Sequence, residues 1–331
     1  MKSLPVNFLI KHPELPPDLE RTSNGIQRRC RGEESGAAVA LDRLRRIRYN
    51  KNDVGFSQKT TKKAAVLPPR EKTMIKAVFF DIDGTLVPWK SGRIPASVFE
   101  SVAALRRKGI LCFVATGRSP FEISAGHLID GLDFDGYLLN NGELGVDADG
   151  TVFYRCPVDP DDLARLLDWV EARGLSCWMV SEKQCAINRL TPAAAQALED
   201  IRTQPPKLGD LRALCREPVY KFSLFLPPEE LPMELLPHCA KTQWHAFGHD
   251  LFSAAGGKQQ AFAATLARYG LTPAQCMAFG DSDNDIGLLT AAGIGVAMEA
   301  GTDGARAAAD FVTRDCEADG IRYALEYFSV L

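Results

Sequence analysis

The sequence has no pair of cysteines close enough to form a zinc or redox motif, although it contains nine cysteines. None of the nine lies two or three residues from another, so no C-x-x-C motif is present. The count is odd, and several cysteines stand inside apolar runs, as in Leu111-Cys112-Phe113. Buried free thiols are typical of a reducing compartment, so the cysteines predict a cytoplasmic protein.

Long hydrophobic runs are also missing from the sequence. No apolar run approaches the roughly 18–20 residues that cross a membrane. The opening MKSLPVNFLIKHPELPP lacks the apolar core of a signal peptide, because Lys11 and prolines follow a very short apolar stretch. The chain also lacks the GxxxxGK[ST] loop that binds nucleoside triphosphates. These absences predict that the protein has no membrane partner and is not a triphosphate-driven machine.

A strong charge imbalance is absent from the chain as a whole but present in its parts. The 331 residues include 39 basic and 42 acidic side chains, for a formal net charge of −3. Residues 1–73 carry 16 basic and 8 acidic side chains, so they have a formal charge of +8 and residues 74–331 have −11. This asymmetry predicts a tail joined to an acidic body, for which nucleic acid is not an expected partner.

Residues 1–73 mix Pro, Gly, Ser, Arg and Lys with few aromatic residues. This composition predicts a basic, disordered N-terminal extension. Two other interpretations stay open. The segment is either an organelle-targeting or nucleic-acid-binding arm, with a short basic helix at 36–48, or it is not part of the natural product. The second of these arises because Met74 stands directly before the first predicted strand.

From Met74 onward, short apolar runs alternate with helical patterns. The apolar runs show no alternation with polar residues, which is typical of parallel strands that are buried on both faces. The predicted strands are 75–80, 110–115, 136–139, 275–279, 294–297 and 310–313, and the predicted helices are 96–108, 121–129, 259–269, 285–292 and 304–308. This order predicts an α/β fold with a doubly wound parallel sheet.

The middle of the chain has a different pattern. A hairpin is predicted at 145–156, with its turn at Asp149-Gly150. The other elements expected there are helices at 160–173 and 192–202 and strands at 175–180, 218–226 and 242–246. Strands and helices grouped in this way predict an inserted α+β domain at 142–249, with the main domain formed by 74–141 and 250–331.

Polar residues follow three of the predicted strands at the point where each strand ends. The segments are Asp81-Ile82-Asp83, Thr116-Gly117 and the run GDSDND at 280–285. The carboxyl ends of parallel strands share one edge of an open sheet, where ligands bind. Lys258, at the start of a predicted helix, can reach the same edge. We expect six side chains to converge there: Asp81, Asp83, Thr116, Lys258, Asp281 and Asp285.

Several carboxylates in one crevice repel one another and require a cation. A set of oxygen ligands without paired His or Cys suits Mg²⁺. Together with a lysine, a threonine hydroxyl and glycine-flanked amides, such an ion suits a phosphoryl group. Asp81 would face phosphorus, and Asp83 would lie one turn on, beside the leaving oxygen. The two carboxylates can then act as nucleophile and general acid/base.

These segments resemble the four motifs of the haloacid dehalogenase superfamily of phosphatases. They occur in order as DIDGT at 81–85, Thr116 in VATGR, Lys258, and GDSDND at 280–285. The C-terminal segment, with Asp319-Gly320-Ile321, is similar to the Cof-type, sugar-phosphatase-like branch. The inserted domain fits the α/β cap of that branch. The resemblance covers 74–331.

The resemblance implies a role for each matching residue. Asp81 would form an aspartyl-phosphate and bind Mg²⁺. Asp83 would protonate the leaving alkoxide, activate water, and bind Mg²⁺ through its backbone carbonyl. Asp281 would be a further ligand, with Asp285 supporting the metal. The residues that would hold the phosphoryl oxygens are Thr116, Gly117, Lys258 and Asn284.

The sequence therefore predicts an Mg²⁺-dependent phosphatase that acts on a small phosphorylated metabolite such as a sugar phosphate. A cap that closes over the crevice excludes water and macromolecules. One alternative is a phosphomutase or phosphotransferase, in which a sugar hydroxyl replaces water. Another is a non-catalytic phosphate-binding or regulatory protein, against which the intact Asp81/Asp83 pair argues. The oligomeric state stays open.

Two further features of the motifs lead to local predictions. Gly256-Gly257 directly before Lys258 suggests a loose approach loop. Arg118 is expected either to contact the substrate or to pair with a surface acid.

Overall fold

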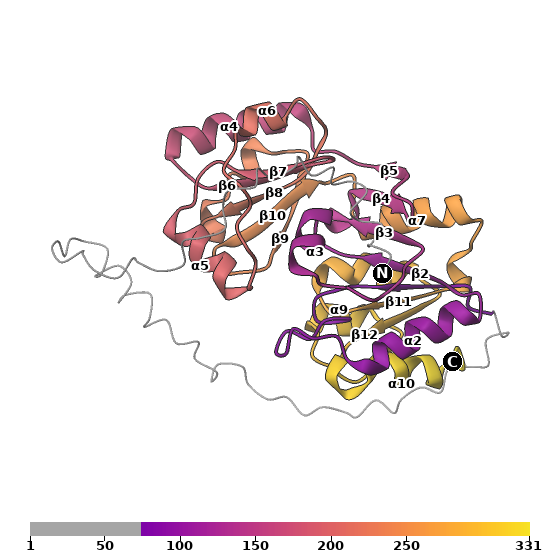
Figure 1. The fold of residues 1–331 in the computed structure, drawn as a ribbon. Coiled ribbons are helices and arrows are strands. Elements are labelled where there is room, and N and C mark those ends of the chain that lie inside the picture. The colour runs from indigo at the N-terminus through magenta and orange to yellow at the C-terminus, as the bar shows by residue number, and fades with distance from the viewer. Residues whose placement is uncertain (1–73) are drawn as a thin grey trace, which may run out of the picture. The chain divides into compact units, whose positions relative to one another are not determined.

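A computed structural model describes residues 74–331. Residues 1–73, for which the sequence predicts a basic, disordered extension, lie outside the described residues. The described chain contains one eight-stranded and one five-stranded sheet (Figure 1). We call the domain built on the larger sheet the core and the domain built on the smaller sheet the cap.

The core sheet has the strand order β13-β12-β11-β1-β2-β3-β4-β5. Neighbouring strands from β13 to β3 are parallel, and β4 and β5 continue the sheet in antiparallel pairing. The strands are β1 (Ala77–Phe80), β2 (Leu111–Ala115), β3 (Gly136–Leu139), β4 (Leu144–Asp147), β5 (Val152–Arg155), β11 (Cys276–Gly280), β12 (Ile294–Ala297) and β13 (Phe311–Val312). The predicted α/β class with a doubly wound parallel sheet is confirmed.

Helices cover both faces of the core sheet, which explains why β1 is apolar throughout. Val78 and Phe80 of β1 pack in the cluster with α2 (Ala96–Arg107) and α10 (Gly320–Tyr327). Ala77 and Phe79 point to the other face. That face is covered by α7 (Lys258–Tyr269), α8 (Ile286–Ala291) and α9 (Asp303–Ala308). In Figure 1, α2 and α10 lie along the same side of the core, and the two helices are in contact.

The cap sheet is antiparallel and has the order β7-β6-β8-β10-β9. Its strands are β6 (Cys177–Ser181), β7 (Cys185–Ile187), β8 (Val219–Phe225), β9 (Cys239–Gln243) and β10 (Gly248–Ser253). One face packs on α4 (Pro160–Arg173) and α6 (Leu211–Leu214), which lie side by side in Figure 1. The other face packs on α5 (Pro192–Asp200) and on Phe121 of the core.

The strand pairing moves the boundaries of the inserted domain. The predicted hairpin at 145–156 forms as β4 and β5, but it extends the core sheet beside β3 and does not belong to the cap. β10 belongs to the cap sheet, although the sequence assigned residues from 250 onward to the core. Two segments therefore connect the domains: the first linker (residues 156–159) and the second linker (residues 254–257).

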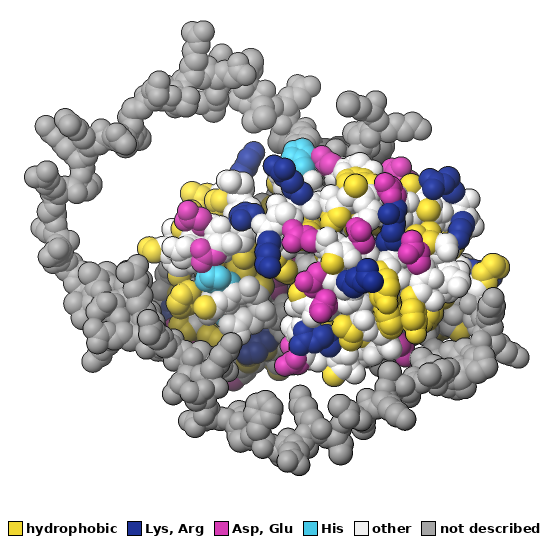
Figure 2. Space-filling view, turned by 90° about the horizontal axis from the view of Figure 1, so that it is seen from below, with side chains coloured by type: hydrophobic (Ala, Val, Ile, Leu, Met, Phe, Trp, Pro, Cys, Tyr) yellow, Lys and Arg dark blue, Asp and Glu magenta, His cyan; other side chains and the backbone are white. Residues whose placement is uncertain are grey.

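Among residues 74–331, no helix is both long and apolar enough to span a membrane. On the face of the described chain shown in Figure 2, acidic and basic side chains are interspersed and do not separate into a basic patch.

Candidate active site

A cleft of about 660 Å³ lies between the carboxyl-end edge of the core sheet and the cap. Both domains contribute to its walls, and the strand-end residues predicted from the sequence meet at its base. Core residues that line it include Asp81, Asp83, Gly117, Arg118, Asn141 and Asn284, and cap residues include Trp178, Lys221, Lys241, Trp244 and Asp250.

Three carboxylates come together at the base of the cleft. Asp81, Asp281 and Asp285 each offer an oxygen within 4.8 Å of the other two, and all three side chains are buried. Oδ1 of Asp281 has no hydrogen-bond partner, whereas its Oδ2 accepts the indole N–H of Trp89 at 3.4 Å. An unpaired buried carboxylate oxygen beside two further carboxylates fits a divalent cation with oxygen ligands, as Mg²⁺ requires.

The crowding of negative groups changes their proton affinities. Burial raises the pKa of Asp281 to about 7, and the charge of Asp285 adds to the rise. Burial also raises the pKa of Asp81 well above its usual value. Lys258 opposes this shift, and the neighbouring carboxylates, including Asp83, reinforce it. A bound cation would favour the ionised forms of these carboxylates.

Lys258 is the first residue of α7, and its buried ammonium joins two of the three carboxylates. Nζ donates to Oδ1 of Asp81 at 2.7 Å and to Oδ1 of Asp285 at 2.5 Å. Burial lowers the pKa of Lys258, but Asp285 and Asp81 outweigh this effect and raise it overall. Oδ2 of Asp285 accepts the backbone N–H groups of Asp281 and Ser282, both at 3.0 Å. The positive charge is therefore fixed beside Asp81, where a phosphoryl group would bind.

Asp83 turns away from the three carboxylates and pairs with Arg118. Nε and Nη2 of Arg118 donate to Oδ2 and Oδ1 of Asp83 at 2.8 and 2.9 Å, and Nη1 donates to Oγ1 of Thr203 in the cap at 2.9 Å. The sequence predicted that Arg118 contacts either the substrate or a surface acid. In the structure it pairs with a candidate catalytic carboxylate, and it also lines the cleft. Gly84 makes the turn possible, because its φ is +81° and a Cβ there would lie 2.1 Å from Oδ2 of Asp281.

The remaining predicted residues lie at the same edge of the sheet. Oγ1 of Thr116 accepts the backbone N–H of Arg118 at 3.1 Å. Nδ2 of Asn284 donates to Oδ1 of Asn141 at 2.9 Å, and Oδ1 of Asn284 has no partner. A Cβ on Gly117 would lie 2.9 Å from that same Asn141 oxygen. Asn141 was not predicted from the sequence, although it is the second residue after the predicted strand 136–139 and polar residues at strand ends are expected to line the site.

The cap contributes a buried lysine that the sequence analysis also missed. Nζ of Lys221, in β8, donates to the backbone oxygen of Gly117 and to Oε2 of Glu122, each at 3.0 Å. It also pairs with Oδ2 of Asp250 in β10 at 3.1 Å. Glu122 belongs to α3 (Pro120–Gly126) of the core, so Lys221 joins cap and core. The sequence does contain a signal for this role, because Lys221 is the one charged residue in the mainly apolar strand β8.

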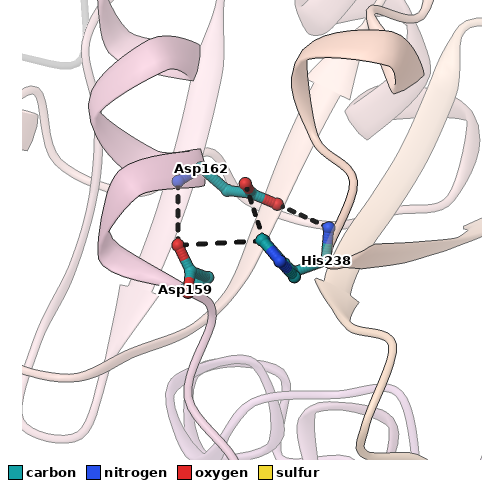
Figure 3. Close-up of side chains that lie close together, drawn as sticks. All are labelled: Asp159, Asp162 and His238. Carbon is teal, nitrogen blue, oxygen red and sulfur yellow. Dashed lines mark hydrogen bonds and ion pairs between the residues drawn. The ribbon is translucent and has the colours of Figure 1, made fainter.

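A second cluster of acidic and imidazole side chains lies in the cap, away from this site (Figure 3). Oδ1 of Asp159 accepts the backbone N–H groups of Asp161 and Asp162 at the start of α4, at 2.9 and 3.2 Å. Asp162 accepts the backbone N–H of His238 at 2.9 Å and contacts its Nδ1 at 3.2 Å. Both carboxylates already have protein partners, so this cluster joins α4 to the start of β9.

The core motifs and the cap together match one known family. A family model described as haloacid dehalogenase-like hydrolase matches residues 78–325. The chain belongs to the haloacid dehalogenase-like hydrolases. It is a phosphatase of the Cof type within this family, which confirms the family and the enzyme class predicted from the four motifs.

Curated relatives of this hydrolase include three bacterial proteins with phosphatase names. YkrA of Bacillus subtilis, named as a phosphatase, is 29% identical over 77% of this chain and 98% of its own length. The pyridoxal phosphate phosphatase YbhA of Escherichia coli is 26% identical over 74% of this chain and 96% of its own. A Streptococcus pyogenes protein, named as a bifunctional phosphatase and peptidyl-prolyl cis-trans isomerase, is 28% identical over 78% of this chain. This chain spans only 54% of that protein.

Solved structures of the family show the same fold. The phosphatase BT1666 of Bacteroides thetaiotaomicron is 28% identical, with a TM-score of 0.72, covering 81% of this chain and all of that one. The subclass IIB sugar phosphatase BT4131 is 28% identical, with a TM-score of 0.67, covering 77% of this chain and all of that one.

Proposed function

We propose that this haloacid dehalogenase-like hydrolase removes phosphate from small phosphate monoesters in the cleft between core and cap. The proposed reaction depends on Mg²⁺ and passes through an aspartyl-phosphate on Asp81. The observation that carries the proposal is the contact of 2.7 Å between Lys258 and Asp81 beside an unpaired, buried oxygen of Asp281. This arrangement combines a nucleophile, a fixed positive charge and a cation site.

The proposed metal site consists of the carboxylates of Asp81, Asp281 and Asp285 and the backbone carbonyl of Asp83. When bound, Mg²⁺ offsets the carboxylate charges and polarises a phosphoryl oxygen. Lys258 stabilises the charge that develops on the phosphoryl group. We assign the remaining phosphoryl contacts to Thr116, Gly117 and Asn284.

In the proposed reaction, a carboxylate oxygen of Asp81 attacks phosphorus, and the bond between phosphorus and the leaving oxygen breaks. Asp83 gives a proton to that oxygen. It then takes a proton from the water that attacks phosphorus and releases phosphate from Asp81. The two hydrogen bonds from Arg118 fix the orientation of the Asp83 side chain. Through Thr203, Arg118 also links this orientation to the cap.

The cleft supports a small phosphorylated metabolite, such as a sugar phosphate, as the substrate. Its volume of about 660 Å³ is that of a small-molecule pocket and leaves no room for a folded macromolecule. Its cap wall combines the indoles of Trp178 and Trp244 with the polar groups of Lys241 and Asp250. Two of the similar proteins are named for a sugar phosphatase activity and a pyridoxal phosphate phosphatase activity, and both names describe small substrates.

We also propose a cytoplasmic location. All eight cysteines among the described residues are free thiols, five of them buried. Free thiols are typical of a reducing compartment.

The test is a screen of phosphorylated metabolites with the purified full-length chain, in Mg²⁺ and in EDTA. We expect release of inorganic phosphate from small sugar phosphates without any acceptor. This release should stop in EDTA and return with Mg²⁺. Release that is unaffected by EDTA would contradict the proposed metal dependence. Phosphate transfer to an added sugar without hydrolysis would favour a phosphotransferase, and no turnover with any ester would favour a binding protein.

A further inference from the structure

Glu143 lies where the core meets both linkers. It directly follows the short turn η2 (Asn140–Gly142) at the end of β3. Its backbone oxygen accepts the N–H of Cys156, in the first linker, at 2.8 Å. Its carboxyl group packs directly on Gly256 of the second linker, because a Cβ on that glycine would lie 2.1 Å from Oε2 of Glu143. One residue therefore touches both connections to the cap.

The carboxyl group of Glu143 is fully buried and poorly paired. The residue is 0% exposed, and neither of its carboxyl oxygens accepts a well-formed hydrogen bond. Burial raises the pKa of Glu143 to about 8, although the Cys156 thiol and the Gly257 backbone N–H favour the charged form. Burial therefore favours the protonated, uncharged form of the side chain.

The groups around Glu143 do not offer it a positive charge. The titratable groups that face it are the Tyr154 hydroxyl, from β5, and the Cys156 thiol. Burial raises the pKa of both, and Glu143 contributes to the rise. From the second linker side, the Ser253 hydroxyl interacts with Cys156. The ammonium of Lys258 is engaged with other carboxylates, and within residues 74–331 no lysine, arginine or histidine contributes to the shift.

The turn that precedes Glu143 packs against the start of α7. A Cβ on Gly142, whose φ is +91°, would lie 2.5 Å from the carbonyl carbon of Gly257 and 2.6 Å from the backbone nitrogen of Lys258. Gly257 has a φ of +115° and directly precedes α7. Gly256 and Gly257 therefore pack tightly against Glu143 and Gly142. The prediction of a loose loop before Lys258 is wrong.

We propose that protonated Glu143 is a positioning residue that holds the second linker and Lys258 in their active arrangement, and that its ionisation releases them. The inference rests on the proposed phosphatase function. An unpaired carboxylate in a buried site is costly, and the structure can relieve that cost by letting water enter between Glu143 and Gly256. Opening this contact moves the start of α7 away from Asp81. Activity should therefore fall as the pH rises past about 8.

The test compares full-length wild type with Glu143→Gln, which keeps the shape and cannot ionise. The rate kcat for p-nitrophenyl phosphate is measured at saturating Mg²⁺ from about pH 6 to about pH 10, each protein being normalised to its own maximum. This substrate has a good leaving group, so the first step of its reaction does not require a proton from Asp83. We expect wild type to lose activity above about pH 8, and Glu143→Gln to retain at least about fivefold more of its maximum at about pH 9.

Two control variants separate Glu143 from other groups. Glu100→Gln changes an exposed glutamate that pairs with Arg322, and Cys156→Ser removes the neighbouring thiol. Glu100→Gln should lose activity at the same pH as wild type. Cys156→Ser, which changes a donor to Glu143, should still lose activity at high pH. The inference would be overturned if kcat of Glu143→Gln fell at the same pH as kcat of wild type. It would also be overturned if Cys156→Ser were the one variant whose kcat did not fall at high pH.

A second measurement does not depend on turnover. The folded-state pKa of Glu143 lies above its ordinary value of 4.5, so its contribution to stability is fully present below that pH and is lost as the pH rises to about 8. With Mg²⁺ bound, the Tm of wild type should therefore fall relative to that of Glu143→Gln across this range. A Tm difference that is constant with pH would overturn the inference. Absence of phosphatase activity in wild type at every pH would overturn the proposed function instead.

Discussion

Arg118 holds the side chain of Asp83 with two hydrogen bonds and contacts the cap through Thr203. Replacement by methionine keeps an unbranched, uncharged stem but removes the guanidinium that fixes this orientation. We expect Arg118→Met to lower kcat by about 10²-fold or more, because general acid catalysis contributes about 10²–10⁴-fold. The loss should be larger for alkyl phosphates than for p-nitrophenyl phosphate, whose leaving oxygen needs no proton.

Steady-state kinetics with both ester types check this prediction. Thr203→Val is the matched control, because it removes only the cap-side partner of Arg118. Its loss in kcat should be much smaller, because both hydrogen bonds from Arg118 to Asp83 remain. Equal losses on the two ester types in Arg118→Met would contradict the assigned role of Asp83.

At the scale of single residues, the positions of Asp81 and Asp83 were predictable, because polar residues at the carboxyl ends of parallel strands meet at one edge of the sheet. The pairing of Arg118 was not predictable from the sequence. Its partner Thr203 is 85 residues away in another domain. A long side chain chooses among several neighbours, and which of them are present depends on how the cap packs. Glu143 was missed for a similar reason, because no local pattern shows that a glutamate will be buried without a partner.

The loop before α7 is the element that couples the second linker to the catalytic lysine. Gly256→Ala would place a methyl group where the Glu143 carboxyl lies. We expect it to lower the free energy of unfolding by about 1–3 kcal/mol, the usual cost of overpacking. Urea unfolding with Mg²⁺ present measures this loss.

The double variant Glu143→Ala/Gly256→Ala supplies the control, because truncation of Glu143 makes room for the new methyl group. The two effects should be non-additive by about 0.5–3 kcal/mol. Additive losses would show that the two residues do not share this contact.

The elements themselves were largely predictable, because buried parallel strands and capped helices leave clear local patterns. The predicted helix 160–173 matches α4 residue for residue. The sequence did not predict β7, which has only three residues, or the correct sheet for β4 and β5. Strand patterns show which residues alternate, whereas the partner of a hairpin is decided by long-range packing. The predicted strand 242–246 covers the last two residues of β9 and then runs into the turn before β10.

On the scale of the whole molecule, Lys221 connects the two domains through buried ion pairs with Glu122 of the core and Asp250 of the cap. Lys221→Met would leave Asp250 buried without this cation and would remove one of the two cations that pair with Glu122, the other being Arg118. We expect a loss of about 3–5 kcal/mol in the free energy of unfolding. Urea unfolding measures the loss, and limited proteolysis should show faster cleavage in the linkers.

Lys241→Met is the matched control, because Lys241 is an exposed lysine of the same cap. Its effect on stability should stay within about 0.5 kcal/mol. Equal stability of Lys221→Met and Lys241→Met would show that the buried pairs do not hold cap and core together.

Every residue that we assign to the site lies within 74–331. A chain that starts at Met74 should therefore have the same Tm, the same kcat and the same Mg²⁺ dependence as the full-length chain. Thermal unfolding and kinetics of the two chains in parallel check this expectation. A lower Tm or kcat in the shorter chain would show that residues 1–73 contribute to the working fold.

The most direct test of the central claim is the rate of Mg²⁺-dependent phosphate release by Asp81→Asn, compared with wild type and with Asp130→Asn. Asp130 is an exposed core residue that pairs with His127, so its variant should keep the wild-type rate. Asp81→Asn keeps the shape of the side chain but removes the nucleophilic carboxylate. We expect it to lose at least about 10³-fold in kcat. A wild-type rate in folded Asp81→Asn would contradict the assignment of Asp81 as the nucleophile.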